Sequence, residues 1–357
     1  MMIRLLSGDT PRSRVLTVLL LLLLLALLCT PFLIPGARAL NMAAKICIFV
    51  VLVASYDLLL GYTGIVSFAH TMFFGIGGYG VAIAMTRFEP GWGALLAGVA
   101  GALAVSMLLA LLIGLFSLRV RAIFFAMITL AVATAFATLV SQLSDWTGGE
   151  DGLSFKVPAL LTPGFALEDA DGEAIEWLGV PLNGKLFSYY LVLAGAAVLF
   201  LMLLRVVNSP FGRVLQAIRE NDFRAEAIGY RTVVYRTVST VLSAAFATLA
   251  GVLMAIWLRY NGPDTSLSFE IMVDILLIVV IGGMGTMYGA VIGTVLFLLA
   301  QTYLQDVMAL ASEATAALPL LSSLLHPDRW LLWLGLLFVL SVYYFPQGIV
   351  GRLRAAR

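Results

Sequence analysis

The chain has 357 residues, of which 62% are hydrophobic and only 11% are charged. An ordinary soluble domain is about one quarter charged, so the composition excludes that class of protein. Apolar runs long enough to cross about 30 Å of hydrocarbon recur along the chain, without the alternation typical of a membrane β-barrel. The sequence therefore predicts an all-α polytopic membrane protein. The net charge of +1 gives no indication of nucleic-acid binding.

Ten apolar segments follow one another in the chain. We expect spans at residues 15–34, 40–60, 67–86, 92–116, 122–142, 187–207, 236–258, 267–282, 286–305 and 330–346. The first segment is followed by Ala37-Arg38-Ala39, which resembles a signal-peptidase site. Because its apolar run continues through Phe32, Leu33 and Ile34, we expect a retained helix. Cleavage would leave the remaining topology unchanged.

The distribution of basic residues predicts the orientation, since cytoplasmic loops carry an excess of Lys and Arg. A cytoplasmic N-terminus and ten spans place 14 of the 21 basic residues inside. Both termini and the Arg-rich loop 208–236 are then cytoplasmic. The loop 143–186, with eight acids and two lysines, lies outside. We expect it to be irregular with a short hairpin, and to serve either as a structural cap or as a docking surface for an external partner.

Two glycine-rich stretches interrupt the hydrophobic pattern, at 61–67 and at 281–286. Glycine at this density weakens helices, and unwound backbone survives in a bilayer only where protein or a water-filled cavity satisfies it. Transporters hold substrates at such breaks, but small residues also form ordinary turns between two spans, and both alternatives stay open. The candidates for a translocation path or gate at the two breaks are Gly61, Thr63, Gly64, Ser67, His70, Gly282, Gly283, Gly285 and Thr286.

Ionisable residues inside spans supply further candidates for the path. Asp57 and Asp274 each lie in an apolar span that ends at a glycine break, which suggests an internal repeat. Charged groups in a bilayer are costly and usually face a cavity or a partner. Each residue also has a structural alternative to a place in the path. The Asp274 carboxylate could be bonded to backbone N–H groups, and the side chains of Asp57 and Lys45 could extend to the membrane surface. His70 could have a packing role.

The inventory of reactive residues argues against an enzyme. The chain has two histidines, His70 and His326, and no His/Cys/carboxylate cluster at metal-ligand spacing. No nucleophile-elbow or Walker sequence is present. We therefore expect no catalytic residue, no metal site and no ATPase site in this chain. Cys29 and Cys47 lie in apolar runs, which favours buried thiols over a disulfide.

The loop 208–236 carries helix signals. Ser209 followed by Pro210 is a helix N-cap with proline at the first helical position. An apolar stripe follows at helical spacing, at Phe211, Val214, Leu215 and Ile218. Asn221 or Asp222 can cap a second short helix that Gly229 ends. The pattern predicts two short helices with charged faces, bound either to anionic lipid or to a cytoplasmic partner.

Three motifs in this order carry a family resemblance. They are GYTGIVSFAHTMFFGIGGYG at 61–80, SPFGRVLQAIREND followed by AEAIGY at 209–230, and GGMGTMYGAVIG at 282–293. The chain resembles the permease subunits of high-affinity branched-chain amino-acid ABC importers, and among them the M-type subunits. The similarity covers about residues 40–305. The same superfamily includes permeases for urea, short amides and sugars.

The resemblance implies a single transmembrane permease domain over 1–357, in a bacterial inner membrane, with 143–186 as a periplasmic loop. Expected partners are a second, H-type permease, a periplasmic binding protein, membrane lipid and two cytoplasmic ATPase subunits that hold ATP and Mg. The loop 208–236 would couple this chain to an ATPase. Its coupling residues would be Arg219, Glu220, Asn221, Phe223, Arg224, Ala225, Glu226, Ala227, Ile228 and Gly229. An apolar knob (Phe223, Ala227, Ile228) would sit within a charged rim (Arg219, Glu220, Arg224, Glu226).

Import of branched-chain or related amino acids is the function that we expect. The alternatives are an ABC permease for urea, short amides or aromatic acids, and an ion-coupled secondary transporter that would use Asp57, His70 and Asp274 as a relay. A membrane enzyme would need a catalytic cluster, which this sequence does not offer. The acidic insert 165–177 and the Leu/Ser-rich stretch 310–325 depart from the family pattern and leave open how a binding protein docks.

Overall fold

A computed structural model describes residues 13–34, 36–117, 122–167, 175–177, 180–314, 324–345 and 348–355. Nine helical stretches in this part of the chain are long and apolar enough to cross a membrane. This confirms the predicted all-α polytopic membrane fold. The stretches are α2 (Arg14–Leu33), α3 (Ala37–Leu60), α5 (Trp92–Ser117), α6 (Ala122–Gln142), α8 (Gly184–Val207), α11 (Thr232–Leu258), α12 and α13 (Pro263–Ser266 and Phe269–Gly282), α14 (Met287–Ala314), and η3 and α16 (Pro327–Arg329 and Trp330–Tyr344) with the start of α17 (Gly348–Ala355).

The remaining expected segment, 67–86, forms α4 (His70–Arg87), which is not among those nine stretches. This helix is rich in glycine and packs between α5 and α11 with most of its side chains buried. A Cβ atom on Gly77 would overlap the carbonyl group of Thr248, so the backbones of α4 and α11 touch. Helix α4 therefore lies inside the bundle, where close packing with other helices replaces the apolar surface of a lipid-facing helix.

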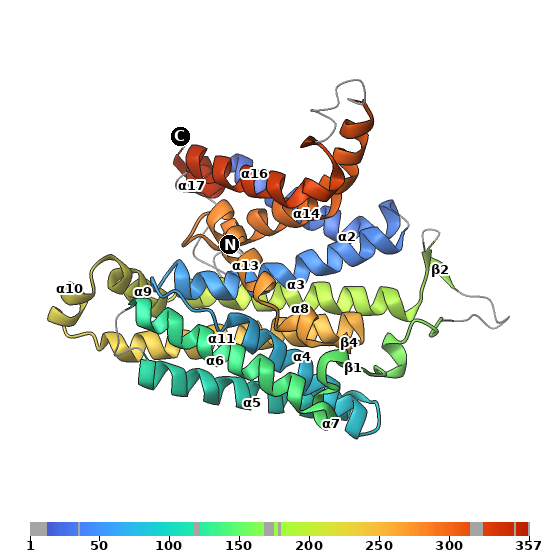
Figure 1. Ribbon diagram of the computed structural model, residues 1–357, viewed down its shortest axis with the longest axis horizontal. Helices are drawn as coiled ribbons and strands as arrows, with labels where there is room; N and C mark the ends of the chain where they lie inside the picture. Colours follow the sequence, from blue (N-terminus) through green and yellow to red (C-terminus); the bar gives the residue numbers. More distant parts are fainter. Residues whose placement is uncertain are drawn as a thin grey trace, which may run out of the picture.

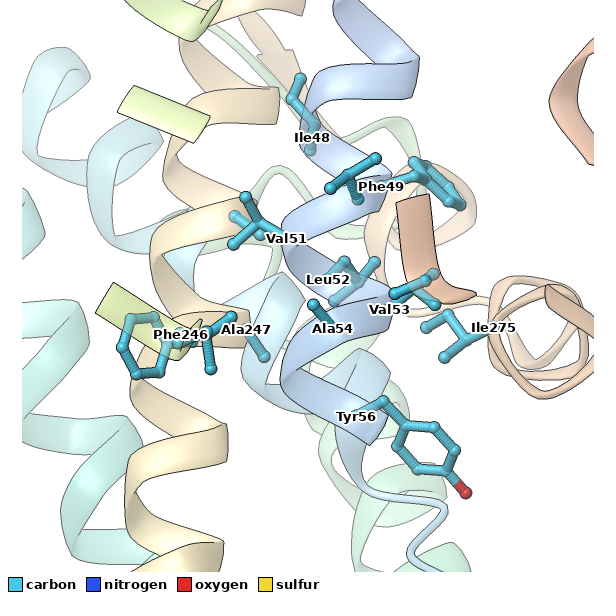
Figure 2. Close-up of a cluster of buried hydrophobic side chains, with 14 of the residues drawn as sticks. Ile48, Phe49, Val51, Leu52, Val53, Ala54, Tyr56, Phe246, Ala247 and Ile275 are labelled. Atoms are coloured by element: carbon cyan, nitrogen blue, oxygen red, sulfur yellow. The ribbon is translucent and has the colours of Figure 1, made fainter. Parts of the chain in front are cut away.

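Helix α3 lies at the centre of the protein. In its candidate membrane span 89% of residues are buried, against 11% in α2 at the periphery. Its neighbours are α8, α11, α13 and α14. Figure 2 shows α3 side chains such as Leu52 and Val53 between Ala247 of α11 and Ile275 of α13. Because α3 is enclosed on several sides, a rearrangement of the bundle must move helices against it.

Helix α2 is held to α8 by side chains from α8. The hydroxyl of Tyr189 donates to the carbonyl oxygen of Leu27 at 2.5 Å, and that of Tyr190 donates to Leu28 at 3.0 Å. These bonds dock the first apolar segment on the bundle. That this segment is kept in the mature protein and not cleaved stays a prediction.

The two long loops lie at opposite ends of the bundle (Figure 1). One end carries α9 (Pro210–Glu220) and α10 (Asp222–Ala227). The other end carries the short elements α7 (Ser144–Thr147), η1 (Gly149–Asp151), β1 (Leu153–Ser154), η2 (Ala159–Leu161), β2 (Glu176–Trp177), β3 (Val180–Pro181) and β4 (Tyr260–Asn261). This arrangement is the one expected if 143–186 and 208–236 face opposite sides of the membrane.

Two antiparallel strand pairs organise the 143–186 loop. Strands β2 and β3 form the hairpin that the sequence predicts, with Trp177 opposite Val180. Strand β1 pairs with β4, with Leu153 opposite Asn261, and so ties the loop to the end of α11. Residues 168–174 of the acidic insert and 315–323 of the Leu/Ser-rich stretch lie outside the described residues.

Candidate functional site

The 208–236 loop forms the two capped helices that the sequence predicts. The Ser209 side chain accepts a hydrogen bond from the Gly212 amide at the start of α9. The Asn221 side chain accepts from the Arg224 amide at 2.9 Å and caps α10. Gly229, directly after the C-cap of α10, has a φ of 100°, a left-handed conformation that favours glycine. The loop is therefore a folded unit.

Helix α10 presents apolar side chains outward. Phe223 is 81% exposed and Ile228, at its C-cap, is 77% exposed, whereas Ala225 is buried. Large exposed apolar groups on a folded unit mark a surface for a partner. The predicted knob residues thus project from the end of the bundle.

The acidic residues of α10 are bonded to α11. Asp222 forms an ion pair with Arg236 at 3.0 Å, and the Glu226 carboxylate accepts a hydrogen bond from the Thr232 hydroxyl at 2.7 Å. These contacts join a short helix to one that runs through the bundle. Helix α10 is thus bonded directly to α11 through both of its acidic side chains.

Arg219, at the end of α9, contacts the first glycine break. Its Nη1 donates to the carbonyl oxygen of Gly61. Its aliphatic stem passes Gly64, where an added Cβ would lie 3.3 Å from Cγ of the arginine. Gly64 has a φ of 74° and so holds a backbone conformation suited to glycine. The contact gives Arg219 an inward-facing role that the sequence did not predict.

The second glycine break meets the first at the same place. The Gly285 amide donates to Oδ1 of Asp57 at 2.8 Å. A Cβ on Gly285 would lie 2.7 Å from Nη1 of Arg219 and 2.9 Å from the Gly61 carbonyl oxygen. The guanidinium of Arg219 and the carboxylate of Asp57 also interact electrostatically. We call these four residues, Asp57, Gly61, Arg219 and Gly285, the inner junction.

The C-terminal helix packs on the second break as well. A Cβ on Gly348, the first residue of α17, would overlap the backbone of Gly283. Val350, two residues further, is fully buried. Within the break, the Thr286 hydroxyl donates to the carbonyl oxygen of Gly283 at 2.7 Å, and Gly282 ends α13. The second glycine break is thus in contact with α17 through Gly283 and with Arg219 of α9 through Gly285.

Hydroxyl groups fasten the first break to α11. The hydroxyl oxygens of Thr63 and Ser239 lie 3.0 Å apart, and both residues are buried. Ser67 lies at the far end of the break, where its hydroxyl accepts from the Ala69 amide at 3.3 Å. Helix α11 therefore contacts both α10 and the break. Thr232 and Ser239 were not predicted as site residues, because their partners lie far away in the sequence.

His70 is fully buried at the start of α4. Its Nε2 lies 2.8 Å from the Ser55 hydroxyl, and its ring packs edge-on against Tyr56. The Ser243 hydroxyl of α11 donates to the carbonyl oxygen of Ser55 at 2.6 Å. This network links α3, α4 and α11. It agrees with the packing alternative for His70, while the path assignment stays a prediction.

Asp274 lies apart from the inner junction. Its carboxylate accepts a hydrogen bond from the Gln301 amide of α14 at 3.4 Å, and that amide also accepts from Lys45 of α3 at the same distance. Gln301 was not predicted, although a side-chain amide within the apolar segment 286–305 is a signal that could have found it. The two acids that suggest an internal repeat thus have different partners, the Gly285 amide for Asp57 and the Gln301 amide for Asp274.

The chain is similar to known membrane transport proteins. Residues 38–342 match the protein family described as branched-chain amino acid transport system / permease component. The high-affinity branched-chain amino acid transport system permease protein LivM of Salmonella typhimurium is 25% identical over 98% of this chain and 77% of its own length. LivM of Escherichia coli K12 is 24% identical over the same shares. A probable LivM of Methanocaldococcus jannaschii is 26% identical over 47% of each chain. No solved structure matches the chain.

Proposed function

We propose that this chain, which belongs to the family of branched-chain amino acid transport system permeases, is the membrane-spanning subunit of an ABC importer. It would bring branched-chain or related amino acids into the cytoplasm. Its place would be the inner membrane of a bacterium, as a multi-pass protein. The energy would come from ATP and Mg bound by two partner ATPase subunits. A second permease and a periplasmic binding protein would complete the complex.

The outward-facing surface of α10 carries this proposal. Phe223 and Ile228 project from a short helix that its own caps and its bonds to α11 hold in place. An apolar knob of this kind fits a groove on a soluble partner. The adjacent Glu220 and Arg224 are exposed and would form the charged rim, which favours one orientation of the partner.

The inner junction explains how movement of α10 would reach the transport path. Helix α9 precedes α10 directly, and Arg219 in its last turn is bonded to Gly61. Gly285 lies against both residues. When the ATPase subunits close on ATP, the loop would shift, and Arg219 would pull on both glycine breaks. The breaks Gly61–Ser67 and Gly282–Thr286 would then act as gates at this end of the bundle.

The experiment is Phe223→Glu, measured with all partner subunits in proteoliposomes. We expect uptake of leucine and binding-protein-stimulated ATP hydrolysis to fall at least about tenfold, because a charge replaces the apolar contact. Gln216→Glu is the matched control, since it adds the same charge at an exposed position of α9. Wild-type activity of Phe223→Glu would refute the coupling assignment.

The substrate is tested separately on the wild-type complex. Uptake of leucine that requires ATP and the binding protein supports the proposed function. Uptake of urea or an aromatic acid in place of leucine would assign another substrate class. Uptake that persists without the ATPase subunits and collapses with an uncoupler would indicate an ion-coupled transporter.

A further inference from the structure

Lys45, Gln301 and Asp274 form a polar cluster between three helices, α3, α14 and α13. Nζ of Lys45 lies 3.4 Å from Oε1 of Gln301, and Nε2 of Gln301 lies 3.4 Å from Oδ2 of Asp274. The ammonium and the carboxylate also interact electrostatically. All three side chains are partly buried. We call them the Lys45–Gln301–Asp274 cluster.

The spacing within this cluster differs from that of a structural ion pair. Arg38 and Asp306, on the same helices α3 and α14, make a direct contact of 2.8 Å. Lys45 and Asp274 form no direct ion pair of this kind among the described residues. Instead, the Gln301 amide lies between them, and both of its distances exceed the usual hydrogen-bond range of about 2.7–3.2 Å. Opposite charges in a bilayer are costly, so charges held apart in this way indicate a functional site.

An apolar layer lies one helical turn from the cluster. Helices α3 and α13 run toward the glycine breaks and α14 runs away from them, so the turn nearer the breaks carries Phe49, Ile278 and Leu298. Each of these side chains is at most 3% exposed. The Lys45 ammonium lies 5.3 Å from the centre of the Phe49 ring, which joins the two layers. Phe49 is seen on α3 in Figure 2, on the side of α13.

We propose that the Lys45–Gln301–Asp274 cluster binds the charged head of a zwitterionic α-amino acid during transport. Lys45 would donate to the carboxylate and Asp274 would accept from the ammonium. The Gln301 amide lies between the two charged side chains in this structure. It can donate to the carboxylate of the amino acid and accept from its ammonium group. An aliphatic side chain would face Phe49, Ile278 and Leu298. This assignment rests on the proposed transport function and names the substrate contacts within it.

The charge pattern has a consequence for selectivity. A zwitterion replaces the bridging amide and gains two charge-assisted hydrogen bonds, which are stronger than neutral ones. Urea and short amides are uncharged and gain neither bond. The cluster therefore favours amino acids over neutral amides. Lys45 and Asp57 both belong to α3, about 18 Å apart along the helix axis, so the cluster and the inner junction share one helix.

The test uses the complete complex in proteoliposomes, with Lys45→Gln, Asp274→Asn and the double variant. We expect each single variant to lower leucine uptake at least about tenfold at low leucine concentration, and the double variant to lower it further. Arg38→Gln is the matched control, because it breaks an exposed ion pair between the same helices. Lys45→Arg and Asp274→Glu keep the charges and are expected to retain more uptake than the neutral variants.

A structural ion pair predicts a different result. Removal of both charges would then relieve the unpaired charge that each single variant leaves, and uptake would return to the wild-type level. That recovery would overturn the proposal, as would equal loss in the charge-keeping and the neutral variants. Stimulation of ATP hydrolysis by the binding protein is measured in parallel to confirm assembly. A wild-type complex that takes up no amino acid refutes the proposed function instead.

Discussion

The guanidinium of Arg219 donates a hydrogen bond to the carbonyl oxygen of Gly61, which lies 158 residues earlier in the chain. The same guanidinium lies beside Gly285, so one side chain contacts both glycine breaks. Arg219 lies in the last turn of α9, and α10 with its exposed Phe223 begins three residues later, after the Asn221 cap. The surface assigned to an ATPase partner is thus linked by a short rigid path to the two places where the membrane helices are interrupted.

Gly285→Ala tests the packing of the inner junction. Gly285 has a φ of 79°, and its new methyl group would lie 2.7 Å from Arg219. We expect the free energy of unfolding to fall by about 1–3 kcal/mol, because the conformation is unfavourable and the space is filled. The measurement is thermal unfolding of the purified complex in detergent. Gly101→Ala is the control, since Gly101 lies in α5 with no atom near its Cβ position, and equal losses in the two variants would contradict this prediction.

Asn221→Ala tests the rigidity of α10. The Asn221 side chain caps this helix through the Arg224 amide, and loss of such a cap costs about 1 kcal/mol. We expect faster amide hydrogen exchange over residues 222–227 and weaker coupling of ATP hydrolysis to uptake. Gln216→Ala, at an exposed position of α9, is expected to leave exchange in α10 unchanged. Unchanged exchange in Asn221→Ala would show that the bonds to α11 alone hold the helix.

Thr63→Val tests the bond between the first break and α11. The change leaves the buried Ser239 hydroxyl without its Thr63 partner, so we expect the free energy of unfolding to fall by about 1–3 kcal/mol. Adding Ser239→Ala removes the unpaired hydroxyl and is expected to recover part of that loss. Thermal unfolding of the two variants and the wild type provides the comparison. A double variant less stable than Thr63→Val would contradict the importance of this pair.

Features set by neighbouring residues could be predicted from the sequence. Most apolar segments correspond to helices within a few residues, although α14 continues to Ala314, beyond the expected end at residue 305. Ser209, Asn221 and Gly229 begin or end helices as expected. These features depend on local backbone chemistry and on the length of apolar runs. The role of α4 was harder to predict, because its glycines fit both a weak span and a closely packed central helix.

Contacts between distant segments could not be predicted. An arginine in a basic loop has many possible partners, and only the packing of α9 on the bundle brings Arg219 to Gly61. Gln301 joins Lys45 and Asp274 for the same reason, since three helices must first align. The sequence identified Lys45 and Asp274 but not Gln301, and only tertiary packing determines which polar residues meet.

The central claim is that Arg219 transmits movement of the α9–α10 loop to the glycine breaks. The most direct test is Arg219→Gln, with leucine uptake and ATP hydrolysis measured on the same proteoliposomes and Arg213→Gln, at an exposed position of α9, as control. We predict that stimulated hydrolysis persists while uptake falls about tenfold or more, because a charge-assisted hydrogen bond to Gly61 is lost. Uptake at the wild-type level would contradict the claim. An equal fall in hydrolysis and uptake would also contradict it and would place Arg219 in the ATPase contact instead.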